Sequence, residues 1–290
     1  MSPRRDPHVA PVVKWAGGKR QLLDEILPLL PARIRFYCEP FVGGGALLFA
    51  RQPRRALVND LNCGLIELYA VIRDDIDALL ADLLRHENTP EYFYALRDLD
   101  RDAVRFAALS PVQRASRLLY LNKTCFNGLF RVNASGQFNT PFGSYRNPTI
   151  ADEPTLRAVH RYLSQNAVEL RSEDFERTLS DVPRGGFVYL DPPYDPVSET
   201  ANFTGYQRGG FGREEQLRLR RCCDDLHRRG VRFLLSNSAT PFIRGLYADF
   251  DVHIVKARRS VNRDAGGRGP IEEVLVRNYG TQRRRMGTAL

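Results

Sequence analysis

Two strand–turn–helix units constrain the fold of this chain more than any other feature. The first joins a β-prone segment to a helix-like run through three consecutive glycines. The second joins an apolar strand to a long amphipathic helix through a turn with two prolines. The predicted strands are residues 34–38, 56–60, 187–190 and 231–235, and the predicted helices are 46–50 and 213–229. Near-continuous apolar strands that alternate with helices predict an α/β fold, with a parallel sheet covered on both faces.

A helix-rich stretch lies between the two units. Helical spacing occurs at residues 65–84, 92–99 and 112–121, and a loop dense in Asn, Gly, Phe and Arg follows. We interpret residues 63–151 as an inserted, mostly helical domain, and residues 1–62 with 152–290 as the domain that holds the sheet. Within the loop, Ala134-Ser135-Gly136 predicts the turn of a hairpin.

The charge balance indicates a polyanionic partner. The net charge is +9, and most of the basic residues are arginines, whose planar guanidinium suits phosphates and guanine edges. A GC-rich genome would also enrich arginine, so charge alone decides little. The five cysteines are scattered without a C-x-x-C pair, which argues against a zinc site or disulfides. No apolar run approaches the roughly 20 residues that span a bilayer, and the first residues lack the apolar core of a signal peptide, so we expect a cytoplasmic protein.

The glycine-rich turn at residues 39–45 is typical of a nucleotide-binding site. Asp60 ends the next strand about 20 residues later, where it can accept hydrogen bonds from ribose hydroxyls. G-x-G-x-x-G is absent, which fits a nucleoside without phosphates, such as S-adenosylmethionine. A tight turn followed by an N-capping aspartate is the competing interpretation. Residues 14–19 add an aromatic face at Trp15 and a charge at Lys19, although a lone tryptophan is more often a core residue.

The turn Asp191-Pro192-Pro193-Tyr194 carries the most specific chemistry. The exocyclic amine of a base is a poor nucleophile because its lone pair is conjugated with the ring. The Asp191 carboxylate and the main-chain carbonyl of Pro192 can each accept one of its N–H groups, and the prolines direct that carbonyl outward. Tyr194 offers a flat face for a base taken out of a helix. The pattern indicates methyl transfer to a planar amine, and an ordinary turn after a strand is the alternative.

The order of these segments resembles the DNA adenine methylase (Dam) family. That order is Lys-Trp-Ala-Gly-Gly-Lys, Glu-Pro-Phe-Val-Gly-Gly-Gly, Asn-Asp-Leu-Asn and Asp-Pro-Pro-Tyr, with further matches at residues 122–133, 138–143, 200–203, 235–237 and 255–260. The resemblance covers roughly residues 11–279. It implies a Rossmann-like S-adenosylmethionine-dependent methyltransferase sheet and an inserted DNA target-recognition domain. It also implies S-adenosylhomocysteine as the cofactor product, and no metal.

The resemblance assigns roles to individual residues. The catalytic motif is Asp191, Pro192, Pro193 and Tyr194. The cofactor-binding positions are Trp15, Lys19, Glu39, Phe41, Gly43, Asp60 and Asp191. The DNA-binding positions are Lys123, Phe126, Asn127, Leu129, Arg131, Pro141 and Tyr145.

These DNA-binding assignments agree with side-chain chemistry. Arg131 suits the O6 and N7 edge of a guanine, and Phe126 could fill the gap left by a flipped base. Lys123 and Asn127 suit phosphates or base edges. An ordinary surface loop anchored by buried Phe126 and Phe130 is the competing interpretation.

Two further segments are expected near the DNA. The basic run at residues 256–259 and the loop at 261–269 would face phosphates, with a solvated basic surface as the alternative. The loop at 198–212 would close over the flipped base.

The expected activity is methylation of N6 of a flipped-out adenine in double-stranded DNA, within GATC, by a monomer in a bacterial or phage context. Two alternatives remain open. One keeps the cofactor and changes the acceptor to N4 of cytosine or an amine in RNA. The other is a non-catalytic DNA-binding protein with a degenerate methylase fold.

Overall fold

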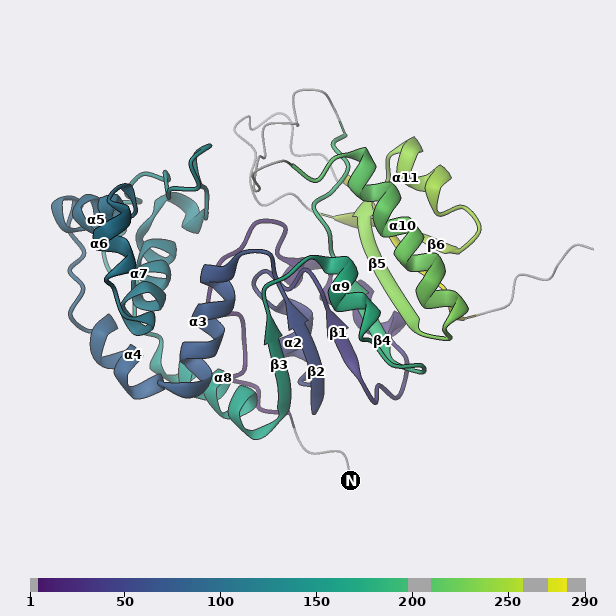
Figure 1. Ribbon diagram of the computed structural model, residues 1–290, viewed down its shortest axis with the longest axis horizontal. Coiled ribbons are helices and arrows are strands. Elements are labelled where there is room, and N and C mark those ends of the chain that lie inside the picture. Colours follow the sequence, from purple (N-terminus) through teal and green to yellow (C-terminus); the bar gives the residue numbers. More distant parts are fainter. Residues whose placement is uncertain (1–4, 198–209, 258–270, 281–290) are drawn as a thin grey trace, which may run out of the picture.

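The computed structural model describes residues 5–197, 210–257 and 271–280, and this part of the chain contains one sheet of seven strands (Figure 1). The strands are β1 (Tyr37–Glu39), β2 (Arg55–Asn59), β3 (Ala167–Arg171), β4 (Phe187–Leu190), β5 (Arg232–Ser238), β6 (Asp251–Ala257) and β7 (Ile271–Arg277). Their order across the sheet is β3-β2-β1-β4-β5-β7-β6. Strands β1 to β5 are parallel, whereas β7 runs antiparallel to β5 and β6. The predicted α/β fold is confirmed, and the antiparallel edge was not predicted.

Helices connect most of the strands. They are α1 (Leu23–Ile26), α2 (Ala46–Arg51), α3 (Cys63–Asp74), α4 (Ile76–Leu83), α5 (Pro90–Arg97), α6 (Ala103–Ala107), α7 (Pro111–Thr124), α8 (Glu153–Gln165), α9 (Phe175–Ser180), α10 (Arg213–Arg228) and α11 (Pro241–Leu246). Short 3-10 turns lie at Lys19–Leu22, Leu27–Leu29, Asp98–Arg101 and Phe126–Gly128. The prediction of one helix over 65–84 is wrong. Asp75 adopts φ −135° and ψ 45°, outside the helical region, and this break separates α3 from α4.

The sheet is covered on both faces because successive residues of a strand point in opposite directions. In β4, Phe187 and Tyr189 pack in a cluster with residues of α2, α3 and α8, whereas Val188 and Leu190 pack in a second cluster with residues of α9, α10 and α11. Figure 1 labels these helices around the sheet. β1, β2, β5 and β7 alternate between the same two clusters. This two-sided burial explains why the central strands are almost continuously apolar.

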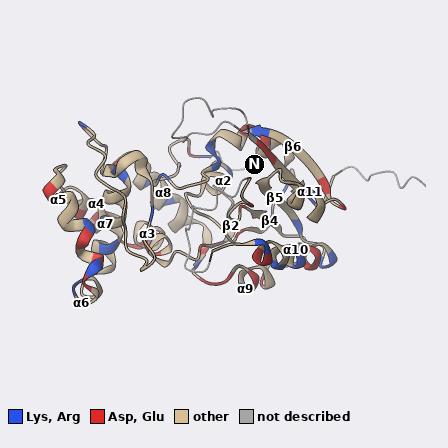
Figure 2. Cartoon of the chain, turned by 90° about the horizontal axis from the view of Figure 1, so that it is seen from above, with Lys and Arg blue, Asp and Glu red and all other residues tan. Residues whose placement is uncertain are grey.

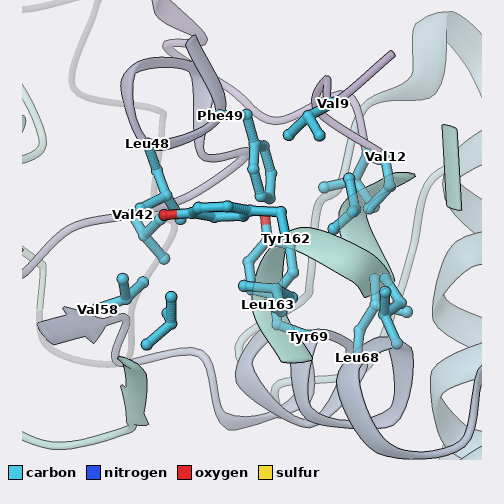
Figure 3. Packing of buried hydrophobic residues seen from close by; sticks show 14 of the residues in the cluster. Val9, Val12, Val42, Leu48, Phe49, Val58, Leu68, Tyr69, Tyr162 and Leu163 are labelled. Atoms are coloured by element: carbon cyan, nitrogen blue, oxygen red, sulfur yellow. The ribbon is translucent and has the colours of Figure 1, made fainter. Parts of the chain in front are cut away.

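The core around α2 positions the glycine-rich turn. Phe49 of α2 packs edge-on against Tyr69 of α3 and Tyr162 of α8, with ring centroids 5.9 and 6.2 Å apart (Figure 3). The Tyr69 hydroxyl donates a 2.8 Å hydrogen bond to the carbonyl of Gly43. Truncating a buried phenylalanine to alanine costs about 3–5 kcal/mol, so the turn from β1 into α2 is attached to one of the most stable parts of the molecule.

The helix-rich segment packs against the same core. Helix α3 packs against α8 beside the sheet and against α7 within the insertion. Leu65, Leu79 and Leu119, from α3, α4 and α7, belong to the cluster that covers one face of the sheet. A separate small cluster lies beneath the loop that follows α7 and contains Phe93, Tyr120, Leu121, Cys125 and Phe138. The division of the chain at residues 62/63 and 151/152 stays a prediction.

All five cysteines are free thiols, and four of them are buried. Within the described ranges, none of the helices combines the length and the hydrophobicity that crossing a membrane requires.

Candidate active site

The predicted catalytic and cofactor-binding residues meet at one edge of the sheet. From β1 the chain continues to β2 on one side, whereas β4 lies on the other, so the strand order reverses between β1 and β4. In open α/β sheets, ligands bind beyond the carboxyl ends of the strands at such a switch point. Glu39 is the last residue of β1, Asp60 follows β2 and Asp191 follows β4. The topology therefore brings three acids from distant parts of the sequence to one edge.

The glycine-rich turn is packed directly against Trp15. Gly43 has φ +46°, and a Cβ atom at this position would lie 2.8 Å from Cδ1 of Trp15, so a side chain is excluded by both conformation and space. The Gly43 N–H donates a 2.9 Å bond to Oδ2 of Asp60. The Asn62 N–H donates a bond of the same length to Oδ1. Each carboxylate oxygen accepts one bond from the described residues, which leaves one lone pair on each that could accept a ribose hydroxyl.

Burial perturbs the acids of this edge. Burial raises the pKa of Asp60, and the two backbone N–H bonds oppose the shift. Burial also raises the pKa of Glu39 to about 8, partly offset by the hydrogen bond from the Tyr37 hydroxyl, and the charges of Asp191 and Asp60 contribute to the rise. The carboxyl groups here outnumber the ammonium of Lys19, so a cationic ligand would favour their charged forms. With the aromatic face of Trp15, these residues fit a sulfonium nucleoside such as S-adenosylmethionine.

Asp191 is held through one of its two oxygens. Lys19 Nζ lies 2.8 Å from Oδ1, and the Ser236 hydroxyl donates a 2.9 Å hydrogen bond to the same atom. Burial raises the pKa of Asp191, and the Lys19 ammonium opposes this shift. Among the described residues, none makes a hydrogen bond or an ion pair with Oδ2. Asp191 thus presents an oriented, unpaired oxygen beside a cation that favours its charged form.

The Asp191–Tyr194 turn is secured through side chains rather than ladder hydrogen bonds. Gln216 of α10 donates a 2.8 Å bond to the Pro193 carbonyl and accepts a 3.1 Å bond from Asn237 of β5. Asn237 in turn accepts a 3.0 Å bond from the N–H of Asp195. The Pro192 carbonyl oxygen has no hydrogen-bond partner among the residues described. This acceptor belongs to the residue that follows Asp191 in the sequence.

Tyr194 is held at both its hydroxyl and its ring. The hydroxyl donates a 2.7 Å bond to Oε2 of Glu273 in β7, and Lys19 Nζ lies 4.5 Å from the ring centroid. Lys19 therefore contacts both the Asp191 carboxylate and the Tyr194 ring.

Phe41 lies beyond the end of β1. Its ring packs against those of Phe175 and Phe211, with centroids 5.4 and 5.7 Å apart.

Five residues of this site were not predicted: Glu273, Ser236, Gln216, Asn237 and Asp195. Ser236 and Asn237 fall in a segment that contributes to the family resemblance, and Glu273 is an acid inside an apolar strand. Polar residues in otherwise apolar strands were therefore an available signal. Gln216 sits on an amphipathic helix, where its sequence neighbours distinguish it from a surface residue only weakly.

Comparison with known proteins shows which family the chain belongs to. The profile of the family described as D12 class N6 adenine-specific DNA methyltransferase matches residues 15–261. The chain belongs to this family. It is 44% identical over 275 residues to a type II methyltransferase of Lactococcus lactis subsp. cremoris, covering 94% of this chain and 96% of that protein. It is 38% identical to a type II methyltransferase of Methanocaldococcus jannaschii, covering 93% of this chain and 99% of that one. It is 34% identical to a DNA adenine methylase of Escherichia coli, covering 91% and 93% respectively.

In this adenine-specific DNA methyltransferase, the insertion contacts the Trp15 segment directly. Trp15 is half-buried and stacks on Phe130, with centroids 4.6 Å apart and an interplanar angle of 21°. The buried Asn122 of α7 accepts a 2.8 Å bond from the N–H of Lys14 and donates 2.8 and 3.2 Å bonds to the carbonyls of Lys14 and Gly128. Asn122 and Phe130 therefore connect the loop after α7 to the segment that contains Lys14 and Trp15.

The predicted DNA-binding residues of the methyltransferase lie mostly on residues 126–145, here called the 126–145 loop. A hairpin is confirmed: Asn133 and Gln137 pair through their backbones, and Gly136 at the turn has φ +80°. Arg131 is exposed, and its guanidinium donates to the side chain and carbonyl of Asn139 at 2.7 and 3.3 Å. Asn127, Pro141 and Tyr145 are exposed, whereas Leu129 is half-buried.

The alternative in which Phe126 is a buried anchor is contradicted. Phe126 keeps 54% of its surface exposed, whereas Phe130 is half-buried between Trp15 and Phe138. Phe126 is free to contact a partner, and Phe130 acts as the anchor of the loop.

Lys123 is placed apart from the exposed loop residues. It is half-buried in α7 and lines a small pocket with Val12, Ile150 and Asp152. Burial lowers its pKa, and the charge of Asp152 opposes the shift. Its DNA-binding role stays a prediction.

The other segments that were expected near the DNA are described only in part. Lys256 is exposed at the end of β6, and Gly210–Gly212 precedes α10. Residues 198–209 and 258–269 lie outside the described residues.

Several arginines of the described residues are paired with acids within the protein. Basic and acidic residues lie together on α10 (Figure 2), where Arg218 contacts Asp174, Glu176 and Glu215, and Arg220 contacts Asp224 and Asp249. These arginines join helices to one another. Their acidic partners are already subtracted in the net charge of +9, so the excess of positive charge lies on other residues.

Proposed function

We propose that this methyltransferase modifies N6 of an adenine turned out of double-stranded DNA, within GATC, with S-adenosylmethionine as the methyl donor. The observation that carries the proposal is that, among the described residues, Oδ2 of Asp191 and the carbonyl of Pro192 accept no hydrogen bond, within the turn that ends at Tyr194. An exocyclic amine has two N–H groups, so two adjacent acceptors match it.

The cofactor residues would hold S-adenosylmethionine on the carboxyl edge of the sheet. Asp60 would accept the ribose hydroxyls, Trp15 and Phe41 would line the nucleoside, and Glu39 would face its positive charge. When bound, this cofactor supplies a methyl group carried on a positively charged sulfur. Gly43 permits the close approach of the ligand to the backbone, since any side chain there would collide with Trp15.

The residues of the turn act chiefly by positioning and electrostatics. Asp191 and the Pro192 carbonyl each accept one N–H of the adenine amine, which directs the nitrogen lone pair away from conjugation with the ring. Tyr194 stacks against the extruded base. The Lys19 ammonium opposes the rise that burial causes in the pKa of Asp191, and so favours its charged form. The amine proton becomes acidic only after the methyl group has been transferred, so Asp191 need not be a strong base beforehand.

The 126–145 loop would read the DNA. Arg131 is exposed and oriented by Asn139, as a guanine contact requires, and the exposed Phe126 could occupy the space left by the flipped base. Asn127, Leu129, Pro141 and Tyr145 surround them in the sequence. Phosphate contacts would add affinity that falls with salt.

Modification-aware sequencing of a plasmid from a methylation-free host that expresses this chain tests the proposal. N6-methyladenine confined to GATC is the expected result. N6-methyladenine in another sequence would correct the site only. N4-methylcytosine, or modified RNA with unmodified DNA, would transfer the activity to the other acceptor. Tight DNA binding without modification or cofactor binding would indicate a non-catalytic protein.

A further inference from the structure

Glu273 is an acid that the chemistry proposed above leaves without a role. It lies in β7, where it pairs with Ser238 of β5 and Val255 of β6. Its Oε2 accepts the 2.7 Å bond from the Tyr194 hydroxyl, across 79 positions of the sequence. Glu273 is half-buried, whereas its neighbour Glu272 is exposed. Successive strand residues point to opposite faces, so the two acids form a matched pair for comparison.

The position is electrostatically unfavourable for an acid. Burial raises the pKa of Glu273, the Lys19 ammonium and the Tyr194 hydrogen bond oppose the shift, and the Asp191 carboxylate adds to it. An apolar residue would complete the sheet here without the desolvation of a charge. Packing of the sheet therefore does not explain the acid, and its contact with Tyr194 does.

Tyr194 requires such an anchor. It follows two prolines, and the flanking main chain is held at Pro193 by Gln216 and at Asp195 by Asn237. These bonds place the backbone, and the direction of the ring is set by its side-chain contacts. Lys19 lies over the ring, and the hydroxyl donates a hydrogen bond to Glu273, so Glu273 fixes the hydroxyl end of the ring.

We propose that Glu273 is a positioning residue for methyl transfer, which fixes the Tyr194 ring where the flipped adenine stacks and makes that ring more electron-rich. The inference rests on the proposed flipping of adenine onto Tyr194. Transfer forms a carbon–nitrogen bond with the lone pair of the amine and breaks the carbon–sulfur bond, whose electron pair stays on sulfur. The adenine amine then carries positive charge until its proton leaves through Asp191 to water. An electron-rich ring stabilises that charge, so the effect acts on the rate of transfer more than on DNA binding.

A double-mutant cycle on the full chain tests this role. Single-turnover rate constants are measured at saturating DNA and S-adenosylmethionine for the wild type, E273Q, Y194F and the double variant. We expect E273Q and Y194F each to lower the rate constant about 10- to 100-fold, the loss expected for one hydrogen bond to a charged group, with the KM for DNA changed less than about threefold. E273Q should have no further effect in the Y194F background, because the hydroxyl through which it acts is absent. E272Q removes the neighbouring exposed charge and should leave the rate at the wild-type value.

An unchanged rate for E273Q, or losses that multiply in the double variant, would overturn the proposal. Glutamine preserves the shape of the side chain, and thermal denaturation verifies that each variant is folded. Replacing the target adenine with 2-aminopurine separates this result from the proposed function. Wild-type enzyme that gives no fluorescence rise on binding would contradict base flipping itself, and the cycle on the adenine substrate would still decide whether Glu273 acts through Tyr194.

Discussion

At the carboxyl edge of the sheet, side chains from β5, β7 and α10 hold the Asp191–Tyr194 turn, whereas the hairpin of the 126–145 loop is held mainly by bonds within itself. The edge is largely buried and contains two acceptors that have no hydrogen-bond partner among the described residues. The loop displays exposed side chains such as Phe126 and Arg131. The two regions are joined through Asn122 and the Trp15–Phe130 stack. The proposed chemistry is therefore placed on residues held by the sheet, and the proposed DNA contacts are placed on exposed residues of a loop.

The largest effect is expected when the Asp191 carboxylate at the carboxyl edge is replaced. Asp191→Asn keeps the size of the side chain but replaces an acceptor oxygen with a donor, and Asp191→Ala removes both. We expect each to lower the methylation rate constant by about 10²–10⁴-fold, the range typical of a lost catalytic proton acceptor, while DNA binding is retained. Methyl incorporation from labelled cofactor and a DNA gel-shift titration measure the two effects. Asp77→Ala, at a side chain 83% exposed, is the control for loss of one negative charge. Near-normal methylation by both Asp191 variants would refute the mechanism.

The matching change in the loop is Arg131→Ala. It should leave the rate constant on the best site nearly unchanged and relax discrimination at one guanine by roughly 1–3 kcal/mol. Competition between sites that differ at single base pairs measures the discrimination. Arg85→Ala is the control for loss of one positive charge. Arg85 follows α4, and its side chain is 76% exposed. Equal discrimination by the two variants would show that Arg131 does not read a base.

The connection between the regions can be cut at Asn122. Asn122→Asp keeps the acceptor for the Lys14 N–H but loses the donors to the carbonyls of Lys14 and Gly128. Leaving these groups unpaired in a buried position should lower the free energy of unfolding by about 1–3 kcal/mol. The affinities for DNA and for cofactor should fall together, because one residue positions both segments. Urea denaturation and separate titrations with each ligand measure this. A loss of affinity for one ligand alone would show that the two segments are held independently.

Features specified by adjacent residues could be predicted from the sequence, whereas contacts between distant positions could not. The two βα units, the Asp191–Tyr194 turn and the hairpin at 134–136 are local patterns, and a few adjacent residues specify each of them. Glu273 and Gln216 act through partners 79 and 23 positions away, and no local pattern indicates that pairing. Lys123 is a similar case, since its half-burial depends on packing between α7 and residues near Asp152. The break at Asp75 was missed because helical spacing continues across it.

The smallest expected effect is on the pH dependence of the free energy of unfolding, which should differ between variants of the carboxyl edge and variants of the loop. Burial raises the pKa of Glu39 from about 4.5 to about 8, so the folded state holds a proton that the unfolded state releases across this interval. The unfolded state binds fewer protons there, and the free energy of unfolding should therefore fall as pH rises from about 4.5 to about 8. Glu39→Gln should flatten that slope. The hairpin at residues 131–139 contains no acid or histidine, so Arg131→Ala should leave the slope intact. Urea denaturation at a series of pH values measures both slopes. An unchanged slope in Glu39→Gln would show that Glu39 is ionised in the folded protein across this interval, with its negative charge compensated by groups of the carboxyl edge.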